Sequence, residues 1–147
     1  MLDPALIAAV LELPASRIDA ALDRLERERF VVFGGDRYSF NGQLVRAVVE
    51  SECIQAGGRR RLRERLIAAL ATHDDVDSQL LRARLLVAER RPDGFEAARS
   101  LAERALGLGA TRTAAAALRL AERAAGDDAA RLAALEPVRQ QQRVAAQ

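Results

Sequence analysis

The amino-acid sequence predicts a mostly α-helical fold with a single β-hairpin. Ala and Leu dominate its 147 residues and only five residues are aromatic. We therefore expect a core in which small side chains let helices approach closely. Clusters of Gly, Pro and Asp divide the second half of the chain into segments of helical length. The exception is the stretch 30–40, where β-branched and aromatic residues flank Gly-Gly-Asp.

Two helices are predicted before the hairpin. Asp3 and Pro4 suit the start of the first, because Asp caps free amides and Pro is tolerated at the first helical position. Its apolar face is predicted to consist of Leu2, Leu6, Ala9, Val10 and Leu13. After Pro14, Ser16 is predicted to cap a second helix that runs to about Arg29. The residues expected to be buried on it are Ile18, Ala21, Leu22 and Leu25.

The hairpin is predicted from two strands, 30–33 and 37–40, joined by the turn 34–36. Helix, Pro-containing turn, helix and hairpin is the element order of a winged helix-turn-helix. The leading helix of that fold has no counterpart here. The sequence therefore predicts a reduced winged helix-turn-helix, either as a variant fold or as a part of a longer chain.

The rest of the chain is predicted to be a tetratricopeptide-like array of helical hairpins. Helices are expected near 43–55, 60–73, 78–90, 94–108, 113–125 and 129–145. The breaks between them are predicted at Gly57-Gly58, Asp74-Asp75, Pro92-Asp93-Gly94, Gly107–Gly109 and Gly126-Asp127-Asp128, and a kink or end is predicted at Glu136-Pro137. Segments 97–109 and 116–128 match at eight of thirteen positions. Two explanations stay open, namely a true internal repeat and the shared alanine-rich composition of two helices. We divide the chain into a winged-helix-like domain, 1–41, and a tetratricopeptide-like region, 42–147.

Four stretches occur in a familiar order. They are LPASRIDAALDRL (13–25), FVVFGGDRYSF (30–40), LVRAVV (44–49) and RRRLRERLIAAL (59–70). They resemble the region behind the nucleotide-binding core of signal-transduction ATPases with numerous domains (STAND-type regulators). The resemblance covers about residues 4–125. This sequence departs from the family at Asn41-Gly42, where a His is common, and at Glu50, where an aromatic residue is usual.

The resemblance implies a non-enzymatic protein-interaction and regulatory module, an arm of a STAND-type signalling ATPase or a related regulator. The partner would be another protein or the upstream ATPase domain. The ATPase core is absent from this sequence, so we expect no nucleotide or other cofactor. We expect no enzyme either, because the single His73, the single Cys53 and the lack of Lys leave no recognisable catalytic set. Cys53 lies among apolar residues, and we expect it in the core.

The alternative function is a DNA-associated winged-helix transcription regulator, with residues 16–29 as the recognition helix. Basic and acidic residues on that helix balance, and Asp23 with Arg27 and Arg24 with Glu28 can neutralise each other. Binding to phosphates needs surplus positive charge. The sequence therefore favours a protein partner over nucleic acid.

Arg59, Arg60, Arg61 and Arg63 form the densest cluster of charge. One interpretation is a contact site for an anion or a partner at a helix start. The other is a solvated helix surface, because Arg61 and Arg63 lie on opposite flanks of the helix. Residues 73–77 offer metal-ligand types, but neighbouring positions rarely converge on one ion, so helix capping by Asp75 or Asp77 is expected.

The sequence contains no membrane-spanning run of about 18 apolar residues. Its first residues lack the basic region of a signal peptide, and one Cys cannot form an internal disulfide. We therefore expect a cytoplasmic protein that makes no membrane contact. The oligomeric state stays open.

Overall fold

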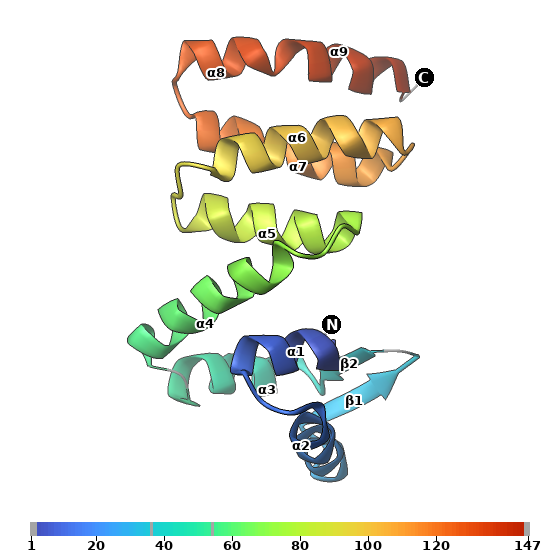
Figure 1. The fold of residues 1–147 in the computed structure, drawn as a ribbon, viewed down its shortest axis with the longest axis vertical. Coiled ribbons are helices and arrows are strands. Elements are labelled where there is room, and N and C mark those ends of the chain that lie inside the picture. The colour runs from blue at the N-terminus through green and yellow to red at the C-terminus, as the bar shows by residue number, and fades with distance from the viewer. Residues whose placement is uncertain (1–2, 36, 54, 146–147) are drawn as a thin grey trace. The chain divides into compact units, whose positions relative to one another are not determined.

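The computed structural model describes residues 3–35, 37–53 and 55–145. Over these residues the chain is mostly helical with one small antiparallel hairpin, as the sequence predicts (Figure 1). The chain consists of two compact units, of which the first ends at Ala69 and the second begins at Leu70. The domain boundary predicted after Asn41 stays a prediction. The helix that follows the hairpin contacts the second strand.

The first unit begins with α1 (Pro4–Leu11) and α2 (Ala15–Arg27). A side-chain oxygen of Asp3 accepts a hydrogen bond from the Ala5 amide at 2.9 Å, so the predicted start of α1 is confirmed. The predicted cap of α2 is wrong. Ser16 lies inside the first turn, and Pro14 occupies the cap position without a side-chain hydrogen bond.

The hairpin pairs β1 (Val31–Gly34) with β2 (Arg37–Phe40) in antiparallel register, Val31 opposite Phe40. Ile18 and Leu22 of α2 are buried together with Val31, which makes a small core. Ala21 and Leu25, also predicted to be buried, are exposed. No described residue of α1 is buried, so the predicted apolar face of the first helix is only partly covered. Leu2 and Asp36 lie outside the described residues.

After the hairpin come α3 (Gln43–Val48), a π-helical turn η1 (Val49–Cys53) and α4 (Ala56–Leu70). The break predicted at Gly57-Gly58 is wrong, because both glycines lie within α4. Arg59 donates from Nη1 to the carbonyl oxygen of Glu50 at 3.1 Å and so ties the start of α4 to η1. The predicted burial of Cys53 falls outside what the structure describes.

The second unit contains α5 (Val76–Ala88), α6 (Gly94–Gly107), α7 (Thr111–Ala125), α8 (Ala129–Ala134) and α9 (Glu136–Ala145). The predicted cap of α5 is confirmed, since Asp75 accepts a hydrogen bond from the Ser78 amide at 2.8 Å. Asp128 caps α8 in the same way. The helix predicted over 129–145 is divided before Glu136, where the sequence predicts a kink or an end.

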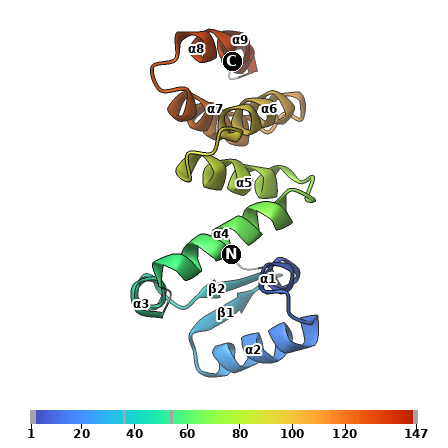
Figure 2. The same cartoon turned by 60° about the vertical axis from the view of Figure 1, so that its left-hand side comes forward.

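The two self-similar segments lie on α6 and α7, which lie side by side (Figure 2). Fully or almost fully buried residues on α6 include Ala98, Leu101, Ala102 and Ala105. Nineteen residues later, the buried residues on α7 include Ala117, Leu120 and Ala121. The shared sequence pattern therefore coincides with a shared buried face, and alanine lets the two helices approach closely.

Candidate functional site

The four arginines singled out in the sequence are exposed on α4. Arg59 is bonded to the Glu50 carbonyl, and Arg60 pairs from Nε with Glu64 Oε1 at 3.2 Å. Neither Arg61 nor Arg63 lines either of the two hollows described below. The contact role of Arg59, Arg60, Arg61 and Arg63 stays a prediction.

A hollow of mixed polarity, with a volume of about 380 Å³, lies between α5 and α6. We call it the α5–α6 hollow. Gln79 and Arg82 come from α5, and the other residues come from α6 and its cap. The lining consists of Gln79, Arg82, Asp93, Glu96, Ala97, Ser100, Leu101 and Arg104. Helix packing brings these side chains together, since they are up to 25 positions apart in sequence.

Hydrogen bonds to the backbone fix two donors of this hollow. Gln79 donates from Nε2 to the carbonyl oxygen of Leu70 at 3.2 Å, and also to the carbonyl oxygen of His73. Arg104 donates from Nη2 to the carbonyl oxygen of Asp74. These bonds satisfy carbonyl groups at the last residue of α4 and in the loop that follows it, and they hold both side chains in place.

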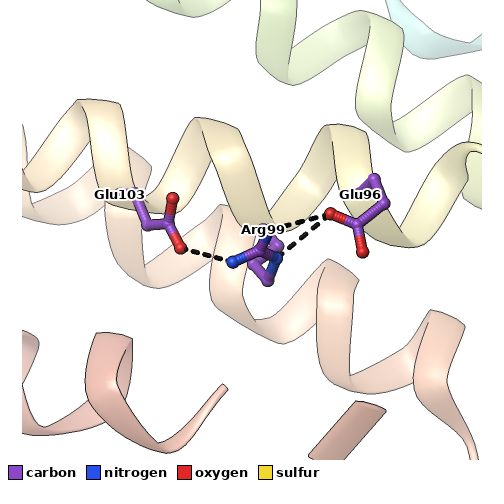
Figure 3. A network of polar contacts seen from close by, with 3 residues as sticks. All are labelled: Glu96, Arg99 and Glu103. Atoms are coloured by element: carbon purple, nitrogen blue, oxygen red, sulfur yellow. Dashed lines mark hydrogen bonds and ion pairs between the residues drawn. The ribbon is translucent and has the colours of Figure 1, made fainter. Parts of the chain in front are cut away.

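The charge of Glu96 is matched within α6 (Figure 3). Arg99 donates to Glu96 Oε2 from Nε at 3.1 Å and from Nη2 at 3.0 Å, and to Glu103 Oε1 from Nη1 at 2.8 Å. The hydrogen bond to Glu96 is the main cause that raises the pKa of the Arg99 guanidinium above its usual value. Glu96 therefore contributes little free negative charge to the hollow.

Arg82 is the unusual member of the α5–α6 hollow. Its Nε is shielded from solvent, and no group in the described part of the chain accepts a hydrogen bond from it. Buried polar groups almost always have a partner, so an unpaired one calls for an explanation. A turn of the Arg82 side chain that opens Nε to the hollow would let an acceptor of a ligand supply the missing bond.

A second hollow, of about 590 Å³, is rich in arginine. We call it the arginine hollow. Its lining consists of Val87, Ala88, Arg90, Arg91, Pro92, Arg123, Ala124 and Arg131. The turn from α5 to α6 and the turn from α7 to α8 lie on the same side of this unit (Figures 1 and 2). The lining residues come from the end of α5, the turn that follows it, the end of α7 and α8.

Sequence reasoning missed both hollows. The arginines of the first are isolated within their helices, and those of the second come from a turn and two later helices. The only available signal was Arg90-Arg91-Pro92, which stands at a break between predicted helices. The dense run of arginines on α4 stands out in the sequence, but its residues line neither of the two hollows described here.

α2 is the helix that would contact DNA in the alternative function. Two arginines on its polar face make contacts within the helix and its C-terminal cap. Arg24 pairs from Nε with Glu28 Oε1 at 2.9 Å, as the sequence predicts. Arg27 instead donates from Nε to the backbone carbonyl of Asp23 at 3.3 Å. These contacts use cations that a phosphate would otherwise bind.

Carboxylates of α2 also surround the hairpin. Glu26 accepts a hydrogen bond from the amide of Phe33 at 3.3 Å. Tyr38 contacts Phe33 with ring centroids 5.0 Å apart. Desolvation, and then the negative charges of Glu26, Asp23 and Asp19, raise the pKa of the Tyr38 hydroxyl. These three carboxylates therefore place negative charge near Tyr38.

Residues 73–77 do not gather round an ion. Across the described ranges, no group of three or more His, Cys, Asp or Glu is placed to hold a metal. Asp75 caps α5, and hydrogen bonds from the Ser78 hydroxyl and amide lower the pKa of its carboxyl. None of the helices that the structure describes has the length and apolar character needed to cross a bilayer.

The geometry thus offers two hollows in the second unit, one of mixed polarity and one strongly basic. Both are suited to recognition, because rigid helices and short turns present their side chains. Comparisons with models of known protein families, with curated proteins and with solved structures found no match to this chain.

Proposed function

We propose that this chain is a non-enzymatic protein-interaction module of a regulator, and that its second unit binds a segment of a partner protein. The observation that carries the proposal is the buried, unpaired Nε of Arg82 in the α5–α6 hollow. Leaving a buried donor without an acceptor is unfavourable. Once the Arg82 side chain turns Nε toward the hollow, a carbonyl or carboxylate oxygen of a bound segment would remove that penalty.

The walls of the hollow support a peptide as the ligand. Ala97 and Leu101 offer apolar contact, whereas Arg82 and the remaining N–H groups of Arg104 offer donors. Peptide and ligand sites typically combine an apolar lining with a few fixed polar groups that set orientation. Stacked helices keep such groups in place, which reduces the entropy lost on binding.

The family resemblance supports a narrower proposal. A winged-helix-like region followed by tetratricopeptide-like hairpins belongs, in STAND-type regulators, behind an ATPase core. We therefore propose that the regulator is of this type, and that the module holds a partner or its own ATPase domain in one state. The carboxylates near Tyr38 and the ion pair of Arg24 with Glu28 support a protein partner over DNA.

Site-specific photocrosslinking tests the proposal. A benzophenone amino acid replaces Ser100, an exposed residue of the α5–α6 hollow, in cells that produce the protein. The matched control carries it at Arg119, the exposed residue at the equivalent position of the self-similar segment on α7. We expect a protein adduct at position 100 that is weak or absent at position 119 and is lost in Arg82→Gln.

Two results would contradict the proposal. Equal adducts at both positions would indicate random collision, and no adduct at either would leave the hollow without a partner. An immunoblot before irradiation tests the narrower proposal. A band several times heavier than 16.0 kDa supports a multidomain regulator, and a band at 16.0 kDa contradicts it.

A further inference from the structure

We propose that the arginine hollow binds an acidic peptide segment of the partner. The inference rests on the proposed function only in taking the partner to be a protein, since it concerns a different hollow. Its basis is four guanidinium groups that line one concave surface with no carboxylate among the lining residues. Guanidinium groups match carboxylates in shape and charge.

This concentration of positive charge is local. Residues 70–147 contain 12 arginines and 11 acidic residues, so the second unit is almost neutral as a whole. Elsewhere in the unit arginines are matched to carboxylates, for example Arg99 to Glu96 and Arg139 to Glu122. Within the described part of the chain, Arg90, Arg91 and Arg123 have no such carboxylate.

Arg131 is held in position from three sides. Its Nε lies 3.4 Å from Asp128 Oδ2, and Nη1 donates to the carbonyl oxygen of Ala124 at 3.5 Å. Its guanidinium carbon lies 5.3 Å from the centre of the Phe95 ring, a cation–π distance. A side chain already fixed in place loses less entropy when a ligand binds.

Arg90 occupies a backbone position that favours glycine. Its φ is 52°, its amide donates to the Val87 carbonyl at 3.1 Å, and the Arg91 amide donates to the Leu86 carbonyl at 2.9 Å. These two bonds form a left-handed helix end, in which glycine avoids steric strain. Gly109 occupies this position at the end of α6. Arg29, after α2, also has a positive φ, so backbone strain does not by itself identify a binding site. The strain at Arg90 nevertheless allows a test that separates the effect on binding from the effect on stability.

The apolar part of the lining favours a peptide over a nucleic acid. Val87, Ala88, Pro92 and Ala124 lie between the guanidinium groups. The volume is within the range of about 300–1,000 Å³ typical of ligand pockets. A nucleic acid needs an extended basic surface along its backbone, and an almost neutral unit does not provide one. Carboxylates interspersed with small apolar side chains fit this lining.

Three of these arginines can also stabilise the helix ends at which they lie, and the test must separate this effect from binding. Arg90, Arg91 and Arg123 lie near the C-terminal ends of α5 and α7, where cations are favoured by the helix dipole. One cation at each end is enough for that effect. The hollow gathers four, from three parts of the chain.

Fluorescence anisotropy with the full chain tests the inference. The probe is a short peptide that alternates Glu with Ala and carries an uncharged dye, and the control probe has Gln in place of each Glu. We expect saturable binding of the Glu peptide at low ionic strength, weakened by salt. Arg123→Ser should weaken it about fivefold, whereas Arg119→Ser, a matched change on the same helix, should leave it unchanged.

Arg90→Gly separates binding from stability. It removes one guanidinium but relaxes the backbone, so we expect weaker binding together with an unchanged or higher melting temperature. Equal loss in Arg123→Ser and Arg119→Ser, equal binding of the Gln peptide, or tighter binding of a single-stranded oligonucleotide would each overturn the inference. If no peptide binds while the adduct at position 100 persists, the proposed function stands and only this inference fails.

Discussion

Arg139 of α9 donates two hydrogen bonds to a single carboxylate oxygen of Glu122 in α7, from Nε at 3.0 Å and from Nη2 at 2.8 Å. A third bond, from Nη1, reaches Glu136 Oε2 at 3.3 Å. The bond to Glu122 is the main cause that raises the pKa of the Arg139 guanidinium. This ion pair joins α9 to α7, which packs against α6 as a helical hairpin.

We predict that Glu122→Gln loosens α9 without unfolding α6 and α7. The ion pair is partly exposed, so its loss should have a modest effect that high salt reproduces in the parent protein. Amide hydrogen exchange should become a few times faster within 136–145. Unchanged exchange there, or faster exchange throughout α6 and α7, would contradict the prediction.

Leu135 lies between α8 and α9 and is completely buried in the main core. We predict that Leu135→Ala lowers the free energy of unfolding by about 3 kcal/mol, because it leaves a cavity. Leu108→Ala is the chemically identical control at a side chain that is 65% exposed, and its effect should stay below about 0.5 kcal/mol. Urea denaturation measures both. Similar values for the two variants would show that Leu135 is not in a tight core.

Replacing two glycines of α6 by alanine should change the stability of the fold in opposite directions. A Cβ at Gly94 would lie 3.2 Å from backbone atoms of Leu86 and Val87, which is too close for easy relaxation. A Cβ at Gly107 would meet nothing within 4 Å. We predict that Gly94→Ala destabilises the fold by about 1 kcal/mol, and that Gly107→Ala stabilises it by about 0.5 kcal/mol. Thermal unfolding of both variants tests the contrast, and equal signs would contradict it.

The cap of α5 should make stability depend on pH. Hydrogen bonds from Ser78 hold the pKa of the Asp75 carboxyl below its unfolded value, so its contribution is present above the unfolded pKa. That contribution is lost as the pH falls through the lower, folded pKa. We predict that Asp75→Ala costs about 1 kcal/mol at neutral pH, and that the difference from the parent shrinks in acid. A difference that is constant across the acid range would contradict this assignment.

Local chemistry made most elements predictable. Asp3 and Asp75 cap the helices that the sequence assigns to them, and the turn at 34–36 joins the two predicted strands. The failures are also local. Gly57-Gly58 reads as a break but lies inside α4, since glycine weakens a helix without ending it. Ser16 is a good cap residue, yet α2 begins one residue earlier, after Pro14.

The candidate sites were not predictable in the same way. Arg82 and Arg104 are 22 positions apart, and only the packing of α5 on α6 brings them to one hollow. Arg90 and Arg131 are separated by two whole helices. The arginine run at 59–63 was visible because its residues are neighbours, whereas concave surfaces form between elements that are distant in sequence.

Buried alanines line the contact between α6 and α7, and they limit which substitutions this pair of helices can accept. Residues such as Ala98, Ala102 and Ala121 are completely buried, and glycine is the only smaller replacement. Glycine weakens a helix interior, and every larger side chain forces the helices apart. Substitutions in α6 and α7 are therefore tolerated mainly on the exposed face of the pair. Descendants of this sequence would be expected to change in the ligands that they bind before they change in the packing of these helices.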